Sequence, residues 1–588
     1  MSDELKHECA VAMAVLRRPP PPNGDFGGTK LSLLLEKQHN RGPDGAGVAI
    51  LAADPVPGEV PYWIAKSASA TPLADVLGMI GKRPADAGGR IFLGHLRYAT
   101  FGKNDAAFCH PFIHPASELG RILLLAGNFN LTNTAELFEA YRRQGEFPTS
   151  RSDGYLICEM IAHELAGQTA QTSDTPSLVC GGAGLPPIAA ALSAALAEAD
   201  GAWTLCGMTG DGWAFATRDP HGIRPGWFYV DDNVAVVASE RPAIQAAFDV
   251  PPDAVQELPP GQAMVISPEG EIAFFPLGNR VSDAERPHGH RPVPRPCVFE
   301  RIYFSRANDA DIHRERKALG AALVPQILNA ADAPASDLFF SYIPNSARIA
   351  FHGLLEELFR MTVNRNAELF AGNAMPRFGE VAVKDAKFRT FIADAGARRE
   401  FYKHVYDVTY GLVRPHSDTL VVLDDSIVRG NTMRNAILPM LDRLEPKRII
   451  IASSAPPIRY PDCYGIDMST LGELVAFRAL VNLLGDGAES ELRAALAKPF
   501  GKGSNPLAPL YARFPETKHA AEIARLLTPP EMKAEVIVVF QTVEALHAAC
   551  PAASGDWYFT GDYPTTGGYR VLRNALLNYL GQKNERSY

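Results

Sequence analysis

The residues best suited to carry chemistry lie in the string TLVVLDDSIVRGNT at positions 419–432. Its leading apolar residues predict a buried parallel strand, which Asp424 and Asp425 follow directly, and a short loop then opens a predicted helix at Gly430, Asn431 and Thr432. Ligands of open α/β sheets bind at this edge, and backbone N–H groups at a helix start favour a phosphate. Two neighbouring carboxylates favour two vicinal hydroxyls, or a magnesium ion held partly through water. The loop therefore predicts a site for a phosphorylated sugar; the plainer alternative is a strand-to-helix turn capped by an Asp.

The whole string resembles the phosphoribosyl-pyrophosphate motif of type I phosphoribosyltransferases, which has four apolar residues, two acids, a Ser and a Gly–Thr loop. The resemblance implies that phosphoribosyl pyrophosphate is bound by seven residues of the string: Asp424, Asp425, Ser426, Arg429, Gly430, Asn431 and Thr432. A second segment, SYIPNSAR at 341–348, is similar to a family segment that reads Pro-Asp-Ser-Gly. Asn345 replaces the acid and Ala347 replaces the glycine, whereas Ser346 remains. We expect Ser346 to bind the substrate and to ligate Mg²⁺ together with Asp424 and Asp425.

A loop rich in cations is expected to cover this site. The segment VKDAKFRTFI at 383–392 carries Lys384, Lys387 and Arg389, whose charges could neutralise pyrophosphate as it leaves. The alternative for all three residues is a solvated charged face. Arg389 is the preferred candidate for binding phosphoribosyl pyrophosphate, because it lies within the RTFI stretch that matches the family.

A nucleophile is suggested by Cys9, which stands between the charged leader MSDELKHE and the apolar run AVAMAVL. A buried strand does not need a cysteine at its first residue. Cysteine attacks as the thiolate, and its reference pKa is about 8.5. A free α-amine, with a pKa of about 7.7–8.0, can accept the thiol proton directly or through water. This base exists only if Cys9 begins the mature chain, so we expect residues 1–8 to be removed by autocatalysis.

Four further strings in the first half carry a second resemblance: KQHNRGPDGAG (37–47), GHLRYATFG (94–102), AGNFNLTN (126–133) and RSDGY (151–155). They resemble the glutamine-amidotransferase domain that begins with a nucleophilic Cys. With the phosphoribosyl motif downstream, the chain resembles the amidophosphoribosyltransferase (glutamine phosphoribosylpyrophosphate amidotransferase) family, from about residue 9 to 570. The resemblance implies an α+β N-terminal-nucleophile hydrolase sandwich (αββα), followed by an α/β type I phosphoribosyltransferase domain with a parallel sheet.

The resemblance also assigns roles in the first domain. Arg97 would grip the glutamine α-carboxylate by a bidentate pair, and Asp153 would hold the α-ammonium group. Asn128 would donate its amide to the tetrahedral oxyanion. The family's next residue is Gly, whose N–H is the second donor; here it is Phe129, a residue that resists positive φ. Taken singly, such residues are usually surface ion pairs or turn residues, and only their joint order favours function. RDPHGIRP (218–225) also matches the family and is interpreted as a structural turn near the domain interface.

The elements that must position these residues differ between the two halves. Short β-rich runs dominate the first half, and helical runs at 31–37, 134–144 and 153–166 interrupt them, which predicts antiparallel sheets between helices. After a Pro- and Arg-rich linker, strands alternate with helices at crossover length, which predicts a parallel, doubly wound sheet. The expected divisions are a leader (1–8), a glutaminase domain (9–280), a linker (281–296), a phosphoribosyltransferase domain (297–480) and a C-terminal tail packed on the second domain (481–588).

Composition limits the class of protein. The net charge of -9, from 57 basic and 66 acidic residues, argues against a nucleic-acid binder. No apolar run is long enough for a membrane helix, and the leader has no apolar core typical of a secretory signal. The eight cysteines show no repeated spacing, which is typical of free thiols in a reducing compartment and predicts a cytoplasmic protein. The family resemblance implies a homo-oligomer and leaves open feedback inhibition by purine nucleotides.

Some members of the family carry an iron–sulfur cluster held by four cysteines. Two candidate positions survive here, Cys297 and Cys463, but the C-x-x-C expected before FTG reads GDWY, with Gly555 and Tyr558 in the two places. Two ligands cannot hold a four-iron cluster. We therefore expect no iron–sulfur cluster, and we expect the aromatic residues of WYF to pack where one would lie. Mg²⁺ is the expected cofactor.

The predicted function is the glutamine-dependent synthesis of 5-phosphoribosylamine from phosphoribosyl pyrophosphate, the first committed step of purine nucleotide biosynthesis. L-glutamine and phosphoribosyl pyrophosphate are then its small-molecule partners. One alternative is a non-catalytic regulator that keeps the phosphoribosyltransferase fold to sense phosphoribosyl pyrophosphate, which the changes at Asn345 and Ala347 favour. Another is a glutamine-dependent sugar-phosphate isomerase, which shares the first domain but has no use for LDDSIVRGNT.

Overall fold

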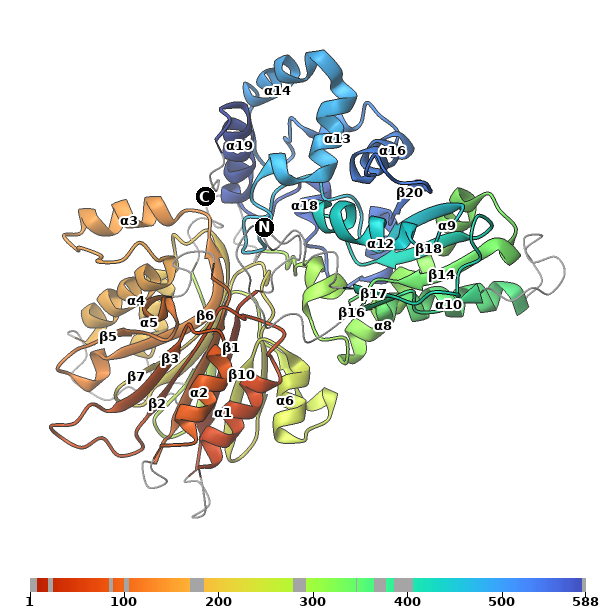
Figure 1. Ribbon diagram of the computed structural model, residues 1–588. Coiled ribbons are helices and arrows are strands. Elements are labelled where there is room, and N and C mark those ends of the chain that lie inside the picture. Colours follow the sequence, from red (N-terminus) through yellow and green to blue (C-terminus); the bar gives the residue numbers. More distant parts are fainter. Residues whose placement is uncertain are drawn as a thin grey trace.

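The computed structural model describes residues 8–18, 25–83, 88–99, 105–169, 185–278, 292–344, 346–363, 377–384 and 406–583 (Figure 1). The first half of the chain forms two antiparallel sheets with helices on their outer faces. The second half forms a parallel sheet flanked by helices, and the last residues return to the first half. None of the helices that the structure describes is long and apolar enough to cross a membrane.

The first sheet has seven strands, in the order β11 (Gln256–Glu257), β9 (Trp227–Val230), β10 (Val234–Ala238), β1 (Ala10–Leu16), β4 (Ile91–Arg97), β2 (Gly45–Leu51) and β3 (Tyr62–Ser67). The second has six, in the order β13 (Ile272–Pro276), β12 (Gln262–Ile266), β8 (Ala214–Arg218), β7 (Gly201–Thr209), β6 (Leu123–Leu131) and β5 (Phe112–His114). All neighbouring strands in both sheets run antiparallel.

Strand β1 shows why the run AVAMAVL is apolar on both faces. Its alternate residues Val11, Met13 and Val15 belong to the core between the two sheets. Its alanines, at the intervening positions, face the helices α1 (Phe26–Glu36) and α6 (Arg241–Phe248). Because successive strand side chains point to opposite faces, large residues fill the sheet–sheet core while small ones let the helices approach.

Helices complete the sandwich on both sides. With α1 and α6, α2 (Pro72–Ile80) covers the seven-stranded sheet. The six-stranded sheet is covered by α3 (Thr134–Arg143), α4 (Asp153–Thr169) and α5 (Pro187–Ala195). The four layers are the αββα arrangement that the resemblance implied, and this prediction is confirmed.

The parallel sheet has the order β15 (Arg377–Phe378), β14 (Leu338–Tyr342), β18 (Thr419–Asp424), β19 (Arg448–Ser453) and β20 (Glu535–Phe540). All four strand pairs are parallel, so the predicted parallel sheet is also confirmed. One face packs on α9 (Val324–Ala331) and α10 (Arg348–Val363). The other packs on α12 (Leu438–Asp442), α13 (Val475–Leu484) and α16 (Glu516–Leu527). A small antiparallel pair, β16 (Ala382–Lys384) and β17 (Tyr406–Val408), stands apart from this sheet.

The segment expected to be a tail does more than pack on the second domain. It supplies β20 to the parallel sheet and α16 to the layer that covers it, so the unit that bears the sheet continues past residue 480. Most of the predicted linker lies outside the described residues. The other helices are α8 (Ala310–Ala322), α14 (Ala488–Leu496), α15 (Ala508–Tyr511), α17 (Val543–Ala549), α18 (Trp557–Thr560) and α19 (Thr566–Leu580). The predicted domain limits remain predictions.

The two halves meet through buried polar contacts. Asn130, near the end of β6, donates to the backbone oxygen of Cys463 at 2.7 Å. Asp200 accepts hydrogen bonds from the hydroxyls of Thr132 and Thr565, each at 2.6 Å, and from Gly567 N at 2.9 Å. Asp200 therefore caps the N-terminus of α19, because a carboxylate at that end satisfies free N–H groups and the positive end of the helix dipole.

Candidate active sites

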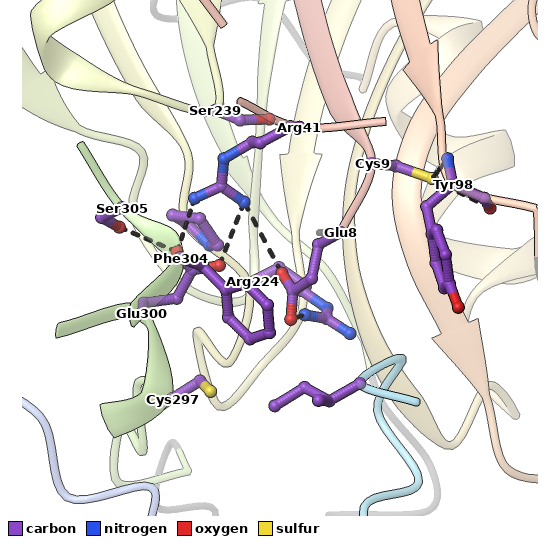
Figure 2. A network of polar contacts seen from close by, with 12 residues as sticks. Glu8, Cys9, Arg41, Tyr98, Arg224, Ser239, Cys297, Glu300, Phe304 and Ser305 are labelled. Carbon is purple, nitrogen blue, oxygen red and sulfur yellow. Dashed lines mark hydrogen bonds and ion pairs between the residues drawn. The ribbon is translucent and has the colours of Figure 1, made fainter. Parts of the chain in front are cut away.

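Cys9 immediately precedes β1, and its thiol lies against the end of β4. Tyr98 N–H donates to Cys9 Sγ at 3.3 Å, and the thiol donates to Tyr98 O at 3.8 Å (Figure 2). The pairing of Ala10 with Leu96 makes this contact inevitable once the strands are in register. Burial raises the pKa of the Cys9 thiol to about 11, although the Tyr98 N–H and the charge of Arg97 oppose the rise. With residue 8 attached, this thiol needs a base to become a nucleophile.

Arg97 ends β4, beside Cys9. Its side chain is buried, and the guanidinium lies over the Phe108 ring with 5.8 Å to the centroid. The chain after it is fixed by Asp44, whose Oδ2 accepts from Ala99 N at 3.1 Å. Residues 100–102 of the predicted motif lie outside the described residues. Arg97 is therefore the last residue of the strand that pairs with β1, and its grip on a carboxylate stays a prediction.

Asn128 lies on β6, opposite Thr204 of β7. Its side chain is buried, and among the described residues its Nδ2 atom has no hydrogen-bond partner. A buried donor without an acceptor is costly, on the order of 1–3 kcal/mol. An acceptor that arrives with the substrate would satisfy it, which supports the predicted donation to an oxyanion.

Phe129 adopts ordinary strand geometry. It pairs with Trp203 in β7, and it is absent from the described residues that have positive φ. Its ring stacks on His110 with 5.4 Å between centroids and 14° between planes. The substitution of Phe for the family's Gly thus needs no left-handed backbone here. The role of its N–H as second oxyanion donor stays a prediction.

Asp153 begins α4, and aromatic packing fixes its place. A side chain at Gly154 would come within 2.7 Å of both Phe112 and Phe129, so glycine lets the helix start lie against β5 and β6. Asp153 Oδ1 accepts from Gly154 N at 2.9 Å. Burial raises the pKa of Asp153 to about 6, while backbone N–H groups oppose the rise. A carboxylate held by backbone groups in a poorly solvated place is suited to an ammonium ligand.

Two histidines near this site had no predicted role. His95 of β4 is buried and stacks on His110, with ring centroids 4.0 Å apart. Burial lowers the pKa of His95 to about 3 and that of His110 well below its ordinary value, so both are neutral. Gly127 N donates to His110 Nδ1 at 3.2 Å, which fixes that ring beside β6. The pair comes from distant segments, so local spacing gives no signal for it.

The second candidate site lies at the carboxyl end of β18. Asp425 is buried; Ser346 Oγ donates to its Oδ1, and Ser426 Oγ donates to its Oδ2 at 2.9 Å. Asp424 Oδ1 accepts from Asp425 N at 3.0 Å. Burial raises the pKa of Asp425, and the two hydroxyls and the charge of Arg316 oppose the rise. The structure thus brings together the three residues predicted to hold a metal.

These donors suit a hard cation. They are two carboxylates and a hydroxyl, and a buried Asp425 favours an incoming positive charge. Among the described residues no group of three or more His, Cys, Asp or Glu side chains is placed to hold a metal. Mg²⁺ fits such a partial set, because it usually keeps several waters and binds through one or two carboxylates plus substrate phosphates.

The loop after Asp425 turns on Gly430. Its φ of +80° lies in the left-handed region, and a Cβ there would be 2.2 Å from Leu527 Cδ2. Arg434 N then donates to Gly430 O at 2.9 Å as the next helix begins, so Asn431 and Thr432 stand at a helix start. This is the predicted geometry for backbone N–H groups that meet a phosphate.

Arg429 contacts acidic residues of the fold, and its binding of phosphoribosyl pyrophosphate stays a prediction. Its guanidinium is buried and donates to Glu473 Oε2 at 2.7 Å and to Asp467 O at 2.9 Å. These contacts tie the loop to the fold and favour a structural role for Arg429. Arg389 and Asn345 lie outside the described residues. Ala347 is buried in the core beneath α10, where its methyl group packs.

The aromatic residues of the C-terminal WYF lie between the two surviving cysteine positions. Tyr558 hydroxyl is 3.4 Å from Cys297 Sγ, and it accepts from Phe299 N at 2.8 Å. Trp557 Nε1 donates to Asp462 Oδ1 at 2.8 Å, directly before Cys463. Cys297, Cys463, Trp557 and Tyr558 belong to one buried cluster. Tyr558 thus contacts the Cys297 thiol, and Trp557 contacts the residue that precedes Cys463.

The chain is similar to curated amidophosphoribosyltransferases from several organisms. The chain is 29% identical over 401 residues to the amidophosphoribosyltransferase of Pseudomonas aeruginosa, covering 66% of this chain and 70% of that protein. It is 28% identical over 404 residues to the enzyme of the same name from Escherichia coli, with the same coverage. The archaeal amidophosphoribosyltransferase of Methanocaldococcus jannaschii is 28% identical over 401 residues, covering 66% of this chain and 74% of that protein. No protein-family profile matches the chain.

Two solved structures share the fold over nearly the whole chain. One is a glutamine phosphoribosylpyrophosphate amidotransferase from B. subtilis complexed with ADP and GMP, with a TM-score of 0.63, 22% identity, and coverage of 95% of this chain and 97% of that one. The other is described as the allosteric regulatory enzyme of purine biosynthesis, with a TM-score of 0.64, 23% identity, and coverage of 95% and 96%. At these identities the likeness is one of fold.

Proposed function

Since the chain belongs to the amidophosphoribosyltransferase family, we propose that it makes 5-phosphoribosylamine from phosphoribosyl pyrophosphate with nitrogen taken from glutamine. Water and L-glutamine give glutamate and ammonia at Cys9. Ammonia then passes within the molecule and attacks C1 of phosphoribosyl pyrophosphate, with inversion, and pyrophosphate leaves. This is the first committed step of purine nucleotide biosynthesis.

The observation that carries this proposal is the presence of two distinct sites in one chain. Cys9 sits at the start of β1 with Tyr98 N–H on its sulfur, and the Asp424–Asp425 pair sits at the end of β18 with Ser346 on Asp425. A glutamine-dependent isomerase would have no use for the second site. A sensor of phosphoribosyl pyrophosphate would have no use for the first, where a buried Asn128 amide awaits an acceptor.

The proposed chemistry in the first domain follows from proton needs. Once residues 1–8 have been removed, the α-amine of Cys9 takes the thiol proton, and the thiolate attacks the glutamine amide carbon. Arg97 and Asp153 hold the glutamine α-carboxylate and α-ammonium groups, and the Asn128 amide and the Phe129 N–H face the developing oxyanion. Arg97 lies on β4, which pairs with β1; Asn128 and Phe129 lie on β6 of the other sheet, and Asp153 begins α4.

In the second domain, Asp424, Asp425 and Ser346 would hold Mg²⁺, which supplies charge stabilisation to the departing pyrophosphate. Asp424 and Asp425 also orient the ribose hydroxyls. The N–H groups around Gly430, Asn431 and Thr432 bind a phosphate, and the charge of Arg389 neutralises the pyrophosphate as it leaves. Purine nucleotides are proposed as feedback inhibitors, and the protein is proposed to be a cytoplasmic homo-oligomer.

Nitrogen-source kinetics test this function. Cys9→Ala should abolish synthesis with glutamine, because no other described thiol lies at the start of β1. Synthesis with ammonium salts should stay within about twofold of wild type. The measurement is phosphoribosylamine formation with each nitrogen source. Cys206→Ala, a change of the same kind at a cysteine buried in the sandwich core, is the control. Equal loss of both activities in folded Cys9→Ala would contradict the division of labour.

A further inference from the structure

The carboxyl of Glu8 is buried in a site built from both halves of the chain (Figure 2). Its Oε1 forms an ion pair with Arg224 Nη1, and its Oε2 lies 3.6 Å from Arg41 Nη1. Neither arginine side chain is open to solvent. A charged side chain is almost never buried this deeply unless something holds it, so the fold provides a specific place for the residue before Cys9.

The arginines are themselves fixed from behind. Arg41 Nε donates to Glu240 Oε1 at 2.8 Å, and its Nη2 donates to Glu300 Oε2 at 2.5 Å. Glu300 belongs to a single π-helical turn, η4 (Glu300–Phe304), in the second half, and Ser305 Oγ donates to its Oε2 at 2.8 Å. Figure 2 shows that the Glu8 side chain points into this network while that of Cys9 points toward Tyr98. The two arginines therefore form a rigid cationic subsite that holds the Glu8 side chain and not that of Cys9.

The backbone of Glu8 is held as well. Gly42 N donates to Glu8 O at 3.0 Å. Gly42 has a φ of +57°, and a Cβ there would lie 2.3 Å from the backbone carbon of Leu96, so glycine alone fits and the N–H has a fixed direction. An N–H aimed at a carbonyl oxygen stabilises the negative charge that develops there when its carbon is attacked.

From these contacts we infer that Arg41 and Arg224 form the recognition subsite for self-processing, which selects a glutamate before Cys9 and presents the Glu8–Cys9 peptide bond to the Cys9 thiol. The inference rests on the proposed function, because it concerns how that function is switched on. Cys9 Sγ bonds to the Glu8 carbonyl carbon, the bond from that carbon to the Cys9 nitrogen breaks, and the thiol proton passes to that nitrogen. The nitrogen thus becomes the free α-amine. Water then hydrolyses the thioester, which releases residues 1–8 with a carboxylate at Glu8 and returns the thiol.

The test measures the fraction of chains that begin at Cys9, by intact mass, during a time course after synthesis. Glu8→Lys places a third cation against Arg41 and Arg224 and should slow processing at least tenfold. Glu4→Lys makes the same change within the same leader and should process like wild type. Glu8→Gln keeps the side-chain length and one acceptor oxygen, and should fall between wild type and Glu8→Lys. Processing of Glu8→Lys at the wild-type rate would overturn the inference.

Folding and function are controlled separately. Unprocessed Glu8→Lys that still makes phosphoribosylamine from ammonium is folded, so its slow processing counts for the subsite. If Glu8→Lys makes no phosphoribosylamine from ammonium, the milder Glu8→Gln variant decides. Processing of Glu8→Gln at the wild-type rate would then overturn the inference. Each chain can also be made as a fusion that is cleaved so that Cys9 becomes the first residue. Because residues 1–8 are then absent, every variant gives the same chain as wild type. Absence of glutaminase activity in that chain would refute the proposed function and leave the mass measurements on processing unaffected.

Discussion

Single residues in the two proposed sites are tuned by burial. The Cys9 thiol has its pKa raised to about 11 while residue 8 is attached, and Asp153 has its pKa raised to about 6. The first shift keeps the thiol protonated, so that it is suited to attack glutamine only after the α-amine of Cys9 has become free. The second leaves Asp153 ionised at neutral pH, but close enough to protonation that mild acid affects it.

Asp153 gives a prediction about pH. An ionised Asp153 binds the glutamine ammonium group, so the KM for glutamine should rise as pH falls below about 6, approaching tenfold per pH unit, because the protonated carboxyl loses that attraction. Asp153→Asn should raise the KM about 10- to 100-fold and flatten this acid limb. Steady-state glutaminase kinetics between pH 5 and pH 8 measure both effects.

Asp211→Asn is the matched control for this prediction. Asp211 lies in the turn between β7 and β8, where it accepts a hydrogen bond from Thr209. Its replacement should leave the KM and its pH dependence unchanged. An acid limb that persists in Asp153→Asn would show that another group binds the ammonium.

Residues that lie within recognisable motifs can be predicted from the sequence, whereas residues that meet only in space cannot. Cys9, Arg97, Asn128 and Asp153 follow from motif order, and each lies on or beside an element that neighbours β1. The subsite around Glu8 could not be predicted, because it joins residues 8, 41, 224 and 300 from four separate segments. RDPHGIRP was expected to be a structural turn near the domain interface; its Arg224 does lie there, and no local sequence pattern indicates its ion pair with Glu8.

At the scale of elements, the turn from β18 into the next helix depends on Gly430. Its positive φ and its contact with Leu527 exclude a side chain. Gly430→Ala should destabilise the protein by about 1–3 kcal/mol and should raise the KM for phosphoribosyl pyrophosphate, because the N–H groups of the loop would shift. Thermal unfolding and ammonium-dependent kinetics measure the two effects.

Gly411 supplies the control for Gly430. It has a φ of +85°, but a Cβ there would have no atom within 4 Å. Gly411→Ala therefore carries the backbone strain alone, and should leave the substrate KM unchanged. Adding Leu527→Ala to Gly430→Ala removes the steric contact and should restore part of the KM. Identical behaviour of the two alanine variants would show that contact with Leu527 has no effect.

The parallel sheet shows which strands could be predicted from the sequence and which could not. The alternation of apolar runs and helices predicted the strands near 338, 419 and 448. The fifth strand, β20, follows β19 after the 81 residues 454–534, which include several helices; this is on the order of several times a usual crossover. The segment 481–588, which mixes helices with short loops, was instead expected to be a tail packed on the second domain. β20 pairs with the edge of β19 that β18 leaves open. A pairing between segments so far apart in the chain has no local sequence pattern that predicts it.

At the scale of the whole molecule, removing charge from the second site should affect the two half-reactions differently. Asp424→Asn with Asp425→Asn keeps size but removes two negative charges from the end of β18. Synthesis of phosphoribosylamine from either nitrogen source should fall by orders of magnitude, because positioning can be worth about 7–11 kcal/mol. Basal glutaminase activity should persist, but its stimulation by phosphoribosyl pyrophosphate should disappear, because that coupling needs the ligand bound.

The chain offers a matched pair for this double change. Asp231 and Asp232 are also adjacent acids, and they lie in the turn between β9 and β10, in the first half. Their double replacement by Asn should leave both half-reactions within about twofold of wild type. Kinetics of the two half-reactions in both double variants decide the matter. Binding of phosphoribosyl pyrophosphate without any phosphoribosylamine from wild type would favour the sensor over the enzyme.

The cap that Asp200 places on α19 joins residues 367 positions apart. During synthesis on the ribosome, Asp200 emerges long before Gly567, so the carboxylate must wait in water while most of the second half is translated. The first half can therefore reach its own sandwich early, but its junction with the last helix closes only when translation is nearly complete. A premature stop codon shortly before α19 would spare both proposed active sites in the sequence and still leave this junction open.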